Sequence, residues 1–522
     1  MQGWLVIAGT LSAVLAAKGI LNRRKRNPRG LPLPPGPKGL PLVGNAFQNA
    51  HDQPWEAYDT LCKEYGDILY LNLMGQDVIV LGSSRRAFDL LESRAKNYSD
   101  RPSGIALIEL TKTAWNFSLM SYGAELRLHR RAFHDYLGKP AAVAQFHPIM
   151  YEETNSFLRK LKDSPDDFSR HIQTLFGNII MRTTYGIDDK KKTAEFIQEA
   201  ETLVRGVVDA KRPGRYLVNS FPFLKYIPAW FPGARFQRHF QKLAELSGKV
   251  HTKPFDVAKE THSTKSSDSS LTSMAAAFIE HFPEAGTDPA SLSEAETLAR
   301  NVCGMAYIAG VDTTAASARC LFYTLATYPE MQRKAQEELD AVVGSGRLPL
   351  ISDRPQLPYV HALVKELSRW YTAVPLGVVH TSTEDDEYDG YFIPKGTFFM
   401  PNTWRLHTSR AIMHDPEVFD RPFEFRPERF LDENGKVDPG VIDADYAAFG
   451  FGRRICPGRG FSNDALFLMT ACILSTFIVE EPKDDTGRPI PIDFKLENGT
   501  LAKLRPFKCD ITMRPERASL VH

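Results

Sequence analysis

The sequence predicts a mainly α-helical protein with small β-sheets, an α+β chain, preceded by one N-terminal transmembrane helix. Three observations support this fold class. The segment from Trp4 to Leu21 is apolar over about the length of a membrane span. Residues 67–83 alternate in polarity around a Gly-Gln turn, which is typical of a β-hairpin. From about Ser84 onward, helical patterns such as SRRAFDLLESRA and TNSFLRKLKD dominate.

The N-terminal segment, residues 1–21, is predicted to be a membrane anchor rather than a cleaved signal peptide. Lys18 is its one charge, whereas five basic residues follow between Arg23 and Arg29. A signal peptide carries positive charge before its apolar run, and none precedes this one. By the positive-inside rule, the basic flank and everything after it stay in the cytosol. A buried core helix is the alternative, and the lack of a polar face argues against it.

Residues 22–45 are predicted to form a basic flank and a proline-rich hinge, and residues 46–522 one large domain. The prolines of LPLPPGPKGLPLVGN favour extended backbone, so a stiff hinge that lifts the domain off the membrane is expected. Residues 221–236 hold six aromatic side chains among prolines. Two interpretations stay open for them: a buried loop, or an exposed segment for membrane contact or substrate access.

Composition excludes several classes of function. The formal net charge over 522 residues is +1, so no nucleic-acid partner is expected. The six cysteines include no CxxC pair and no zinc-type spacing, and so few in a chain of this length suit a reducing compartment. The sequence also has no Walker motif and no lipase-type GxSxG with triad partners.

The stretch FGFGRRICPG admits four interpretations: a phosphate loop, a redox or zinc cysteine, a nucleophile, or a haem ligand. A phosphate loop is excluded because Ile455 stands where the third glycine would be. The stretch matches F-x-x-G-x-R-x-C-x-G at every fixed position, through Phe449, Gly452, Arg454, Cys456 and Gly458. This pattern resembles the haem-binding signature of the cytochromes P-450.

The resemblance implies the cytochrome P-450 fold and haem b, iron protoporphyrin IX, as the cofactor. It further implies that the Cys456 thiolate is the axial ligand of the iron, with N–H groups of the glycine turn donating to the sulfur. Arg454 is expected to pair with a haem propionate through its planar guanidinium.

Two further motifs resemble the family's Glu-Arg-Arg triad, which locks the meander behind the haem cysteine. KELSRW places Glu366 and Arg369 three residues apart on one helix face, and FRPERF supplies Arg429. The alternative for the first two residues is an exposed ion pair that contributes roughly a few tenths of a kcal/mol.

The motif AGVDTT lies in a run too apolar for a surface helix, which predicts a long central helix with a capping box starting at Ser291. In the family, small residues at this place open a groove for O2, and an acid-alcohol pair relays protons. By that resemblance Ala309 and Gly310 form the groove, and Asp312 and Thr313 form the relay. The alternative is a threonine that bonds back to a carbonyl of its own helix.

Two features depart from the family pattern. Arg130 matches the arginine of the family's W-x-x-x-R motif, but Leu126 occupies the tryptophan position, so an indole N–H donor is lost. Propionate binding then falls more heavily on Arg130, Arg454 and His380, the last at a position that commonly contacts a propionate. The segment Arg405–Arg410 is a six-residue insertion relative to usual family members.

The resemblance extends from Pro32 to Pro515 and is strongest to fungal members that act in secondary metabolism or xenobiotic oxidation. It implies a monooxygenase that inserts one atom of O2 into a lipophilic small molecule. We expect it in the endoplasmic reticulum, spanning the lipid bilayer once, with its catalytic domain in the cytosol. A largely apolar substrate pocket is expected between residues 105–117, Met305 and Ala306, and Val374–Val378.

Because no nucleotide-binding fold is present, the electrons must come from a partner. The resemblance implies that this partner is NADPH–cytochrome P-450 reductase. We expect this reductase to dock around Arg453 on the cysteine side of the haem. Two alternatives stay open. One is a haem-thiolate isomerase or dehydratase that does not use O2, although such relatives tend to lose the acid-alcohol pair. The other is a degenerate haem-binding protein without catalytic activity.

Overall fold

The computed structural model describes residues 26–41, 43–46, 53–102, 104, 106–211, 215–219, 221–264, 272–282, 288–404, 412–497 and 501–521. The predicted anchor, residues 1–21, and the inserted segment Arg405–Arg410 lie outside these residues. Within the described ranges, none of the helices combines the length and the apolar character needed to cross a bilayer.

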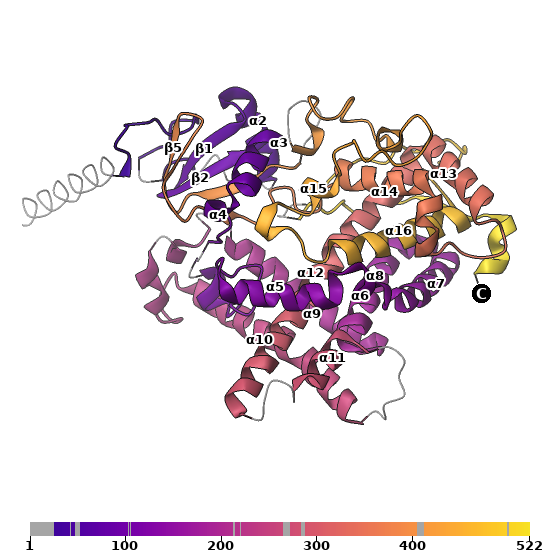
Figure 1. Cartoon of the computed structure of the whole chain (residues 1–522), viewed down its shortest axis with the longest axis horizontal. Coiled ribbons are helices and arrows are strands. Elements are labelled where there is room, and N and C mark those ends of the chain that lie inside the picture. The colour runs from indigo at the N-terminus through magenta and orange to yellow at the C-terminus, as the bar shows by residue number, and fades with distance from the viewer. Residues whose placement is uncertain are drawn as a thin grey trace, which may run out of the picture.

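The protein is mostly helical, with a small sheet region beside the N-terminal part of the chain (Figure 1). The main helices are α2 (Pro54–Tyr65), α5 (Ala124–Leu137), α7 (His147–Asp163), α8 (Phe168–Tyr185), α9 (Lys190–Lys211), α10 (Arg235–Thr264), α12 (Pro289–Thr327), α13 (Pro329–Val342), α14 (Pro358–Trp370) and α16 (Arg459–Thr476). Shorter helices are α3 (Ser84–Ala87), α4 (Ala95–Tyr98), α6 (Pro140–Ala144), α11 (Met274–Glu280) and α15 (Asp445–Ala448). The predicted fold class of the domain, mainly α with small sheets, is confirmed.

Helix α12 runs through the centre of the protein. Its residues from Ala299 onward are largely buried, and it packs against α5, α8, α9, α10 and α16. A helix that is apolar on all sides is stable only when neighbouring helices enclose it. The predicted capping box at Ser291 is wrong, because the helix begins at Pro289 and the carboxylate of Asp288 accepts the Ser291 N–H at 3.1 Å. Proline suits the first helical position, where an N–H would have no partner in the helix.

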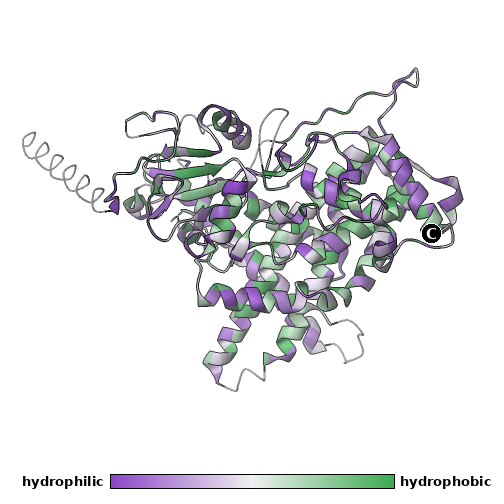
Figure 2. Cartoon of the chain, turned by 45° about the horizontal axis from the view of Figure 1, so that its top comes forward, coloured by the Kyte–Doolittle hydropathy of each residue, from purple (hydrophilic) through white to green (hydrophobic). Residues whose placement is uncertain are grey.

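The larger sheet has the strand order β1-β2-β6-β3, and the strands in it are largely hydrophobic (Figure 2). Strands β1 (Ile68–Leu73) and β2 (Gln76–Leu81) form the predicted hairpin, and β6 (Phe398–Pro401) pairs parallel with β2. The turn is formed by Met74 and Gly75, both with positive φ (53° and 89°), rather than by the Gly-Gln step. The remaining strands are β3 (His380–Thr381), β4 (Asp386–Tyr388), β5 (Tyr391–Ile393), β7 (Phe477–Glu480) and β8 (Asp510–Met513).

The proline-rich segment is extended, as predicted, but it lies against the sheet instead of standing free of it. The carbonyl of Pro35 accepts the Tyr70 N–H at 2.8 Å, and that of Pro32 accepts the Phe392 N–H at 2.8 Å. The backbone approach is so close that a Cβ on Gly36 would lie 2.0 Å from the Tyr70 oxygen. Residues 26–46, here called the N-terminal strap, are therefore part of the surface of the body.

The aromatic segment between α9 and α10 is exposed. Tyr226 and Trp230 each keep 77% of their surface accessible, and Phe223 keeps 64%. The buried-loop interpretation is therefore wrong. Its exposed large side chains, here called the aromatic patch, are Leu217, Phe221, Phe223, Tyr226, Trp230 and Phe231. A contiguous apolar surface of this kind usually contacts another molecule or a membrane.

Candidate functional site

The loop that carries Cys456 connects α15 to α16 and is closed by its own backbone. The Cys456 N–H donates to the Phe449 carbonyl at 2.8 Å. Gly452 has a φ of +51°, and a Cβ there would lie 2.5 Å from the carbonyl oxygen of Leu91. The Gly452 N–H donates to the Glu92 carboxylate at 2.6 Å. Glycine is thus required at this position both by the left-handed backbone and by the close approach of a neighbouring chain segment.

Cys456 lies three residues before the start of α16, where the positive end of the helix dipole favours an anion. Its thiol is half-buried. Burial raises the pKa of this thiol, while the Gly458 N–H and the nearby Arg130 guanidinium act in the opposite direction. The surroundings therefore contain the groups that a thiolate ligand needs once a positive partner is bound.

Three arginines form a cluster of positive charge next to this loop. They are Arg101, which precedes the 106–110 turn, Arg130 on α5, and Arg454 in the cysteine loop. All three donate to backbone carbonyls: Arg101 to Ser118, Val378 and Val379, Arg130 to Ile455, and Arg454 to Ser99 and Met120. Within the described part of the chain, none of the three forms an ion pair with a carboxylate.

The charges of this cluster repel one another in a buried place. Burial, followed by repulsion from Arg454 and Arg130, holds the pKa of Arg101 well below its usual range. Burial lowers the pKa of Arg454 to about 10. The Asp100 carboxylate acts on Arg101 and Arg454 in the opposite direction and so compensates the cluster in part. The remaining concentration of positive charge is costly unless an anion binds among the three arginines. Two carboxylates of an anionic ligand would satisfy this environment, and the two propionates of a haem fit that description.

His380 and Leu126 both lie next to this cluster, and both are buried. His380 shares a hydrogen bond between Nδ1 and the Tyr98 carbonyl at 2.7 Å, and burial together with Arg101 lowers its pKa well below the ordinary value. Leu126 provides no donor. Sequence reasoning named Arg130, Arg454 and His380 for this place but missed Arg101. The sequence Asp-Arg-Pro around Arg101 resembles an ordinary surface turn, so only the folded structure shows that Arg101 belongs to this cluster.

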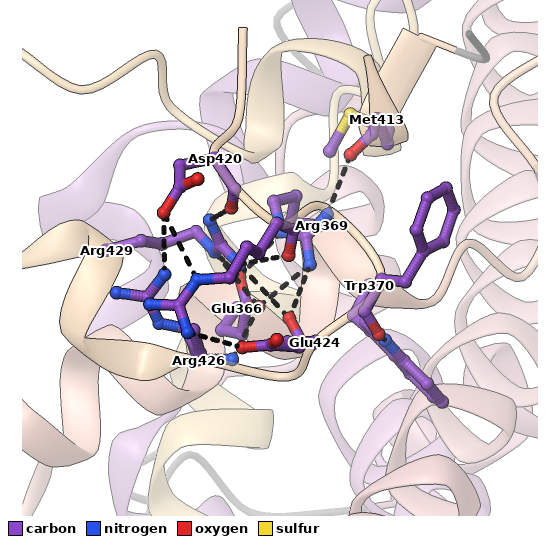
Figure 3. A network of polar contacts seen from close by, with 10 residues as sticks. Glu366, Arg369, Trp370, Met413, Asp420, Glu424, Arg426 and Arg429 are labelled. Carbon is purple, nitrogen blue, oxygen red and sulfur yellow. Dashed lines mark hydrogen bonds and ion pairs between the residues drawn. The ribbon is translucent and has the colours of Figure 1, made fainter. Parts of the chain in front are cut away.

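Glu366, Arg369 and Arg429 are brought together in one network, in which Glu366 and Arg369 are fully buried and the Arg429 side chain is 6% exposed (Figure 3). Two nitrogens of Arg369 donate to the Glu366 carboxylate at 2.7 and 2.8 Å, and Arg429 donates to it at 3.1 Å. Both arginines also donate to carbonyls of the following meander, at Met413, Asp420, Arg421 and Glu424. The exposed-ion-pair alternative is wrong, because the side chains of Glu366 and Arg369 are both 0% exposed.

The residues singled out on α12 face different surroundings. The Thr313 hydroxyl donates to the Ala309 carbonyl at 2.9 Å, which is the back-bonded arrangement considered as an alternative. Asp312 is buried and pairs with the Lys503 ammonium at 3.1 Å. Gly310 lies against α8, where a Cβ would come within 3.1 Å of Ile180. Close helix packing therefore accounts for the glycine, and its role in an O2 groove stays a prediction.

One cavity adjoins Asp312 and another adjoins Arg101. One, of about 600 Å³, is lined by charged side chains that include Asp312, Lys503 and Glu201. Lys503 belongs to no recognisable motif, so sequence reasoning missed it. The other cavity, of about 520 Å³, has a mixed lining, with the charged residues Asp100, Arg101 and Lys395 and apolar side chains such as Leu119, Val378, Val379 and Met400. Of the predicted pocket lining, Val378 is thus present in a cavity, whereas Ile105 lies outside the described residues.

Comparison with known proteins agrees with this geometry. The sequence model of the family described as Cytochrome P-450 matches residues 34–504. The cytochrome P-450 monooxygenase COX1 of Coprinopsis cinerea is 48% identical over 517 residues, which cover 98% of both chains. COX2 of the same organism is 39% identical over 99% of this chain and 95% of its own. Monooxygenase 208 of Postia placenta is 34% identical over 100% and 98% of the two chains.

The chain belongs to the cytochrome P-450 family. Its enzyme class is that of a cytochrome P-450 monooxygenase, as the names of these fungal relatives indicate. The predicted family and enzyme class are confirmed. Haem iron is the cofactor that this family implies, and the half-buried thiol at the start of α16 with three unpaired arginines beside it fits such a group.

The buried position of Glu366 leads to a prediction about stability. Replacing Glu366 with Gln leaves two buried arginines without a carboxylate, so the free energy of unfolding should fall by about 3–5 kcal/mol. Urea unfolding of the purified chain measures this change. The matched control is Glu330→Gln, which removes an exposed partner of Arg333 and should change the same quantity by less than about 0.5 kcal/mol. Equal effects of the two substitutions would contradict the network's role.

Gly452 allows a test of the cysteine loop itself. Gly452→Ala should lower the free energy of unfolding by about 2–3 kcal/mol, because its Cβ would meet the Leu91 carbonyl in a left-handed backbone. Gly460→Ala, in α16 with open space around its Cα, should be neutral or slightly stabilising. Thermal and urea unfolding of both variants provide the comparison. If Gly452→Ala unfolds like Gly460→Ala, the loop does not have this conformation.

Proposed function

We propose that this cytochrome P-450 inserts one oxygen atom from O2 into a lipophilic small organic substrate, with electrons from NADPH delivered by cytochrome P-450 reductase. The observation that carries the proposal is the half-buried Cys456 beside two buried arginines, Arg101 and Arg454, and the half-buried Arg130, none of which forms an ion pair with a carboxylate among the described residues. Because the relatives are fungal proteins named monooxygenases, we extend the proposal for this chain to a role in secondary metabolism or xenobiotic oxidation.

The residues around Cys456 would hold the haem. The Cys456 thiolate would bind the iron, and Arg101, Arg130 and Arg454 would bind the propionates, with His380 as a further contact. When bound, haem supplies the activation of O2, which a thiolate ligand promotes by donating electron density that favours O–O cleavage. The protein's own contribution is to keep the thiolate dry, to orient the substrate and to deliver protons.

Asp312 and Thr313 would handle those protons. The Asp312 carboxylate faces the charged cavity and pairs with Lys503, so it can accept a proton from that side. The Thr313 hydroxyl donates to the Ala309 carbonyl. To relay a proton it would turn away from that carbonyl and release its own proton on the interior side as its oxygen accepts one from Asp312. Transfer from Asp312 Oδ1 to Thr313 Oγ1 would connect the charged cavity to the interior of the protein.

The cavity beside Arg101 supports the choice of a lipophilic substrate. Its volume of about 520 Å³ lies in the range of small-molecule sites, and much of its lining comes from apolar side chains. The segment that carries the aromatic patch reaches this cavity, because Asn219, two residues after Leu217, belongs to its lining. A lipophilic compound could therefore pass from an apolar surface into the protein.

We further propose that the protein is a single-pass protein of the endoplasmic reticulum with its domain in the cytosol. The apolar stretch from Trp4 to Leu21 and the basic residues after it support this topology. The exposed aromatic patch is a second surface suited to a lipid bilayer.

A reductase would meet a basic surface on the cysteine side. Arg453 is exposed, and its guanidinium lies 4.9 Å from the centre of the Tyr122 ring, with the Arg127 guanidinium 5.8 Å from the same ring. Tyr122 thus fixes two cations close to the loop that holds Cys456. Flavoprotein partners with an acidic surface would be attracted to such a patch.

The proposed function is tested by the reduced-CO difference spectrum of the full-length protein. A Soret band at the position typical of thiolate ligation is expected, and Cys456→Ser should abolish it while Cys62→Ser, in α2, should keep it. NADPH consumption with reductase and candidate lipophilic substrates then separates an oxygenase from an isomerase. A thiolate-type band in Cys456→Ser, or substrate turnover without NADPH consumption, would overturn the proposal.

Charge reversal at Arg453 tests the reductase surface. Arg453→Glu should raise the reductase concentration needed for half-maximal turnover about fivefold at low salt, because it places repulsion at the centre of the patch. The dependence on salt should weaken as well. Lys249→Glu, an exposed reversal on α10, is the control and should change neither quantity. Unchanged reductase dependence in Arg453→Glu would exclude this docking surface.

A further inference from the structure

The start of the N-terminal strap lies against an acidic hairpin of the body, although some 350 residues separate them in sequence. Figure 1 shows the indigo beginning of the described chain beside the hairpin that carries β5. The Arg26 guanidinium binds both oxygens of the Asp385 carboxylate, with Nε at 2.9 Å from Oδ2. Arg29 binds the Glu387 carboxylate at 2.5 Å. After Arg29 the strap runs along the sheets, where the carbonyls of Pro32 and Pro35 accept hydrogen bonds from the body.

The acidic residues of this hairpin divide between two partners. Successive side chains of a strand point to opposite faces, and the contacts follow this alternation. Asp385 and Glu387 bind the strap, whereas Asp386 binds Arg94 of the body at 2.9 Å and accepts the Tyr98 hydroxyl at 2.7 Å. The hairpin is therefore fixed to the body through one face and offers two carboxylates on the other.

The local geometry prepares both sides of this contact. The Lys395 N–H donates to Asp385 at 2.6 Å, which orients that carboxylate independently of Arg26. On the strap, the Asn27 side chain binds both the N–H and the carbonyl of Leu31, at 2.9 and 2.8 Å. This turn places Arg26 and Arg29 on one side of the chain. The pKa of Asp385 is lowered chiefly by its hydrogen bond from Arg26.

We propose that the acidic hairpin is an intramolecular docking site for the basic strap, and that Asp385 and Glu387 fix the point at which the N-terminal segment joins the body. Sequence analysis assigned these arginines to the basic flank that follows the membrane anchor and stays in the cytosol. The structure instead engages them with carboxylates of the protein. Each exposed pair contributes little by itself, but two pairs on a pre-ordered turn act together.

The position of this docking site affects how the enzyme would be oriented relative to a membrane. Thr383 and Lys395, at the base of the hairpin, line the cavity of about 520 Å³ that Asn219 also lines. The docking site thus adjoins a cavity whose lining also includes Asn219, from the segment that carries the aromatic patch. If the proposed membrane attachment is correct, holding the strap at Arg26 keeps this cavity at a constant angle to the bilayer.

Limited trypsin digestion of the full-length protein tests the docking site, because trypsin cleaves after Arg29. With both carboxylates neutralised, in Asp385→Asn/Glu387→Gln, cleavage at this bond should be about fivefold faster than in the wild type. The control Glu433→Gln/Asp485→Asn removes the same charge from exposed positions and should leave the rate unchanged. At about 1 M salt the wild type should approach the rate of the neutralised variant.

Hydrogen exchange distinguishes loss of docking from loss of the hairpin. The neutralised variant should lose amide protection between residues 26 and 31 while β4 and β5 keep theirs. A cleavage rate equal to that of the wild type would overturn the proposal. So would loss of protection throughout β4 and β5, because the two carboxylates would then stabilise the hairpin itself. Neither measurement depends on haem or on turnover, so the result is separate from the proposed function.

Discussion

The carboxylate of Glu366 is the interaction on which the cysteine site depends. This carboxylate is fully buried, and it accepts hydrogen bonds from Arg369, from Arg429 and from the backbone N–H of Arg426. Through the two arginines, one negative charge holds four carbonyls of the segment that leads to Cys456. Because a buried carboxylate costs several kcal/mol unless paired, this segment has one arrangement that satisfies every partner. The position of the cysteine loop follows from that constraint.

The other buried charges of the site are arranged in the opposite way. Glu366 is surrounded by cations, whereas Arg101, Arg130 and Arg454 donate their hydrogen bonds to carbonyl oxygens and are compensated only in part, by the charge of Asp100. Carbonyl dipoles orient a guanidinium without neutralising it. The protein therefore keeps a region of positive potential beside a thiol, and it keeps it rigid through contacts that reach from α5 to the cysteine loop. A compensated network stabilises the fold, and an uncompensated one indicates where an anionic cofactor belongs.

What the sequence could predict depended on whether the signal was local. Polarity alternation identified the β1–β2 hairpin, and the apolar run identified α12, since both patterns arise within one element. Glu366, Arg369 and Arg429 were named correctly as neighbours only because they occur in recognisable motifs. Arg101, Lys503 and the contact of Arg26 with Asp385 carry no such motif. The role of each depends on a partner that lies far away in the sequence, so composition and periodicity could not reveal that role.

The replacement of tryptophan by Leu126 illustrates how a missing donor is balanced. Sequence reasoning placed the added burden of propionate binding on Arg130, Arg454 and His380. Burial holds the pKa of His380 well below its ordinary value, so this residue would contribute as a neutral donor rather than as a cation. Arg101, in contrast, adds a full charge that is already oriented by three carbonyls. The substitution at position 126 therefore removes one neutral donor from a site that retains three cations for two carboxylates, and the charge balance favours binding.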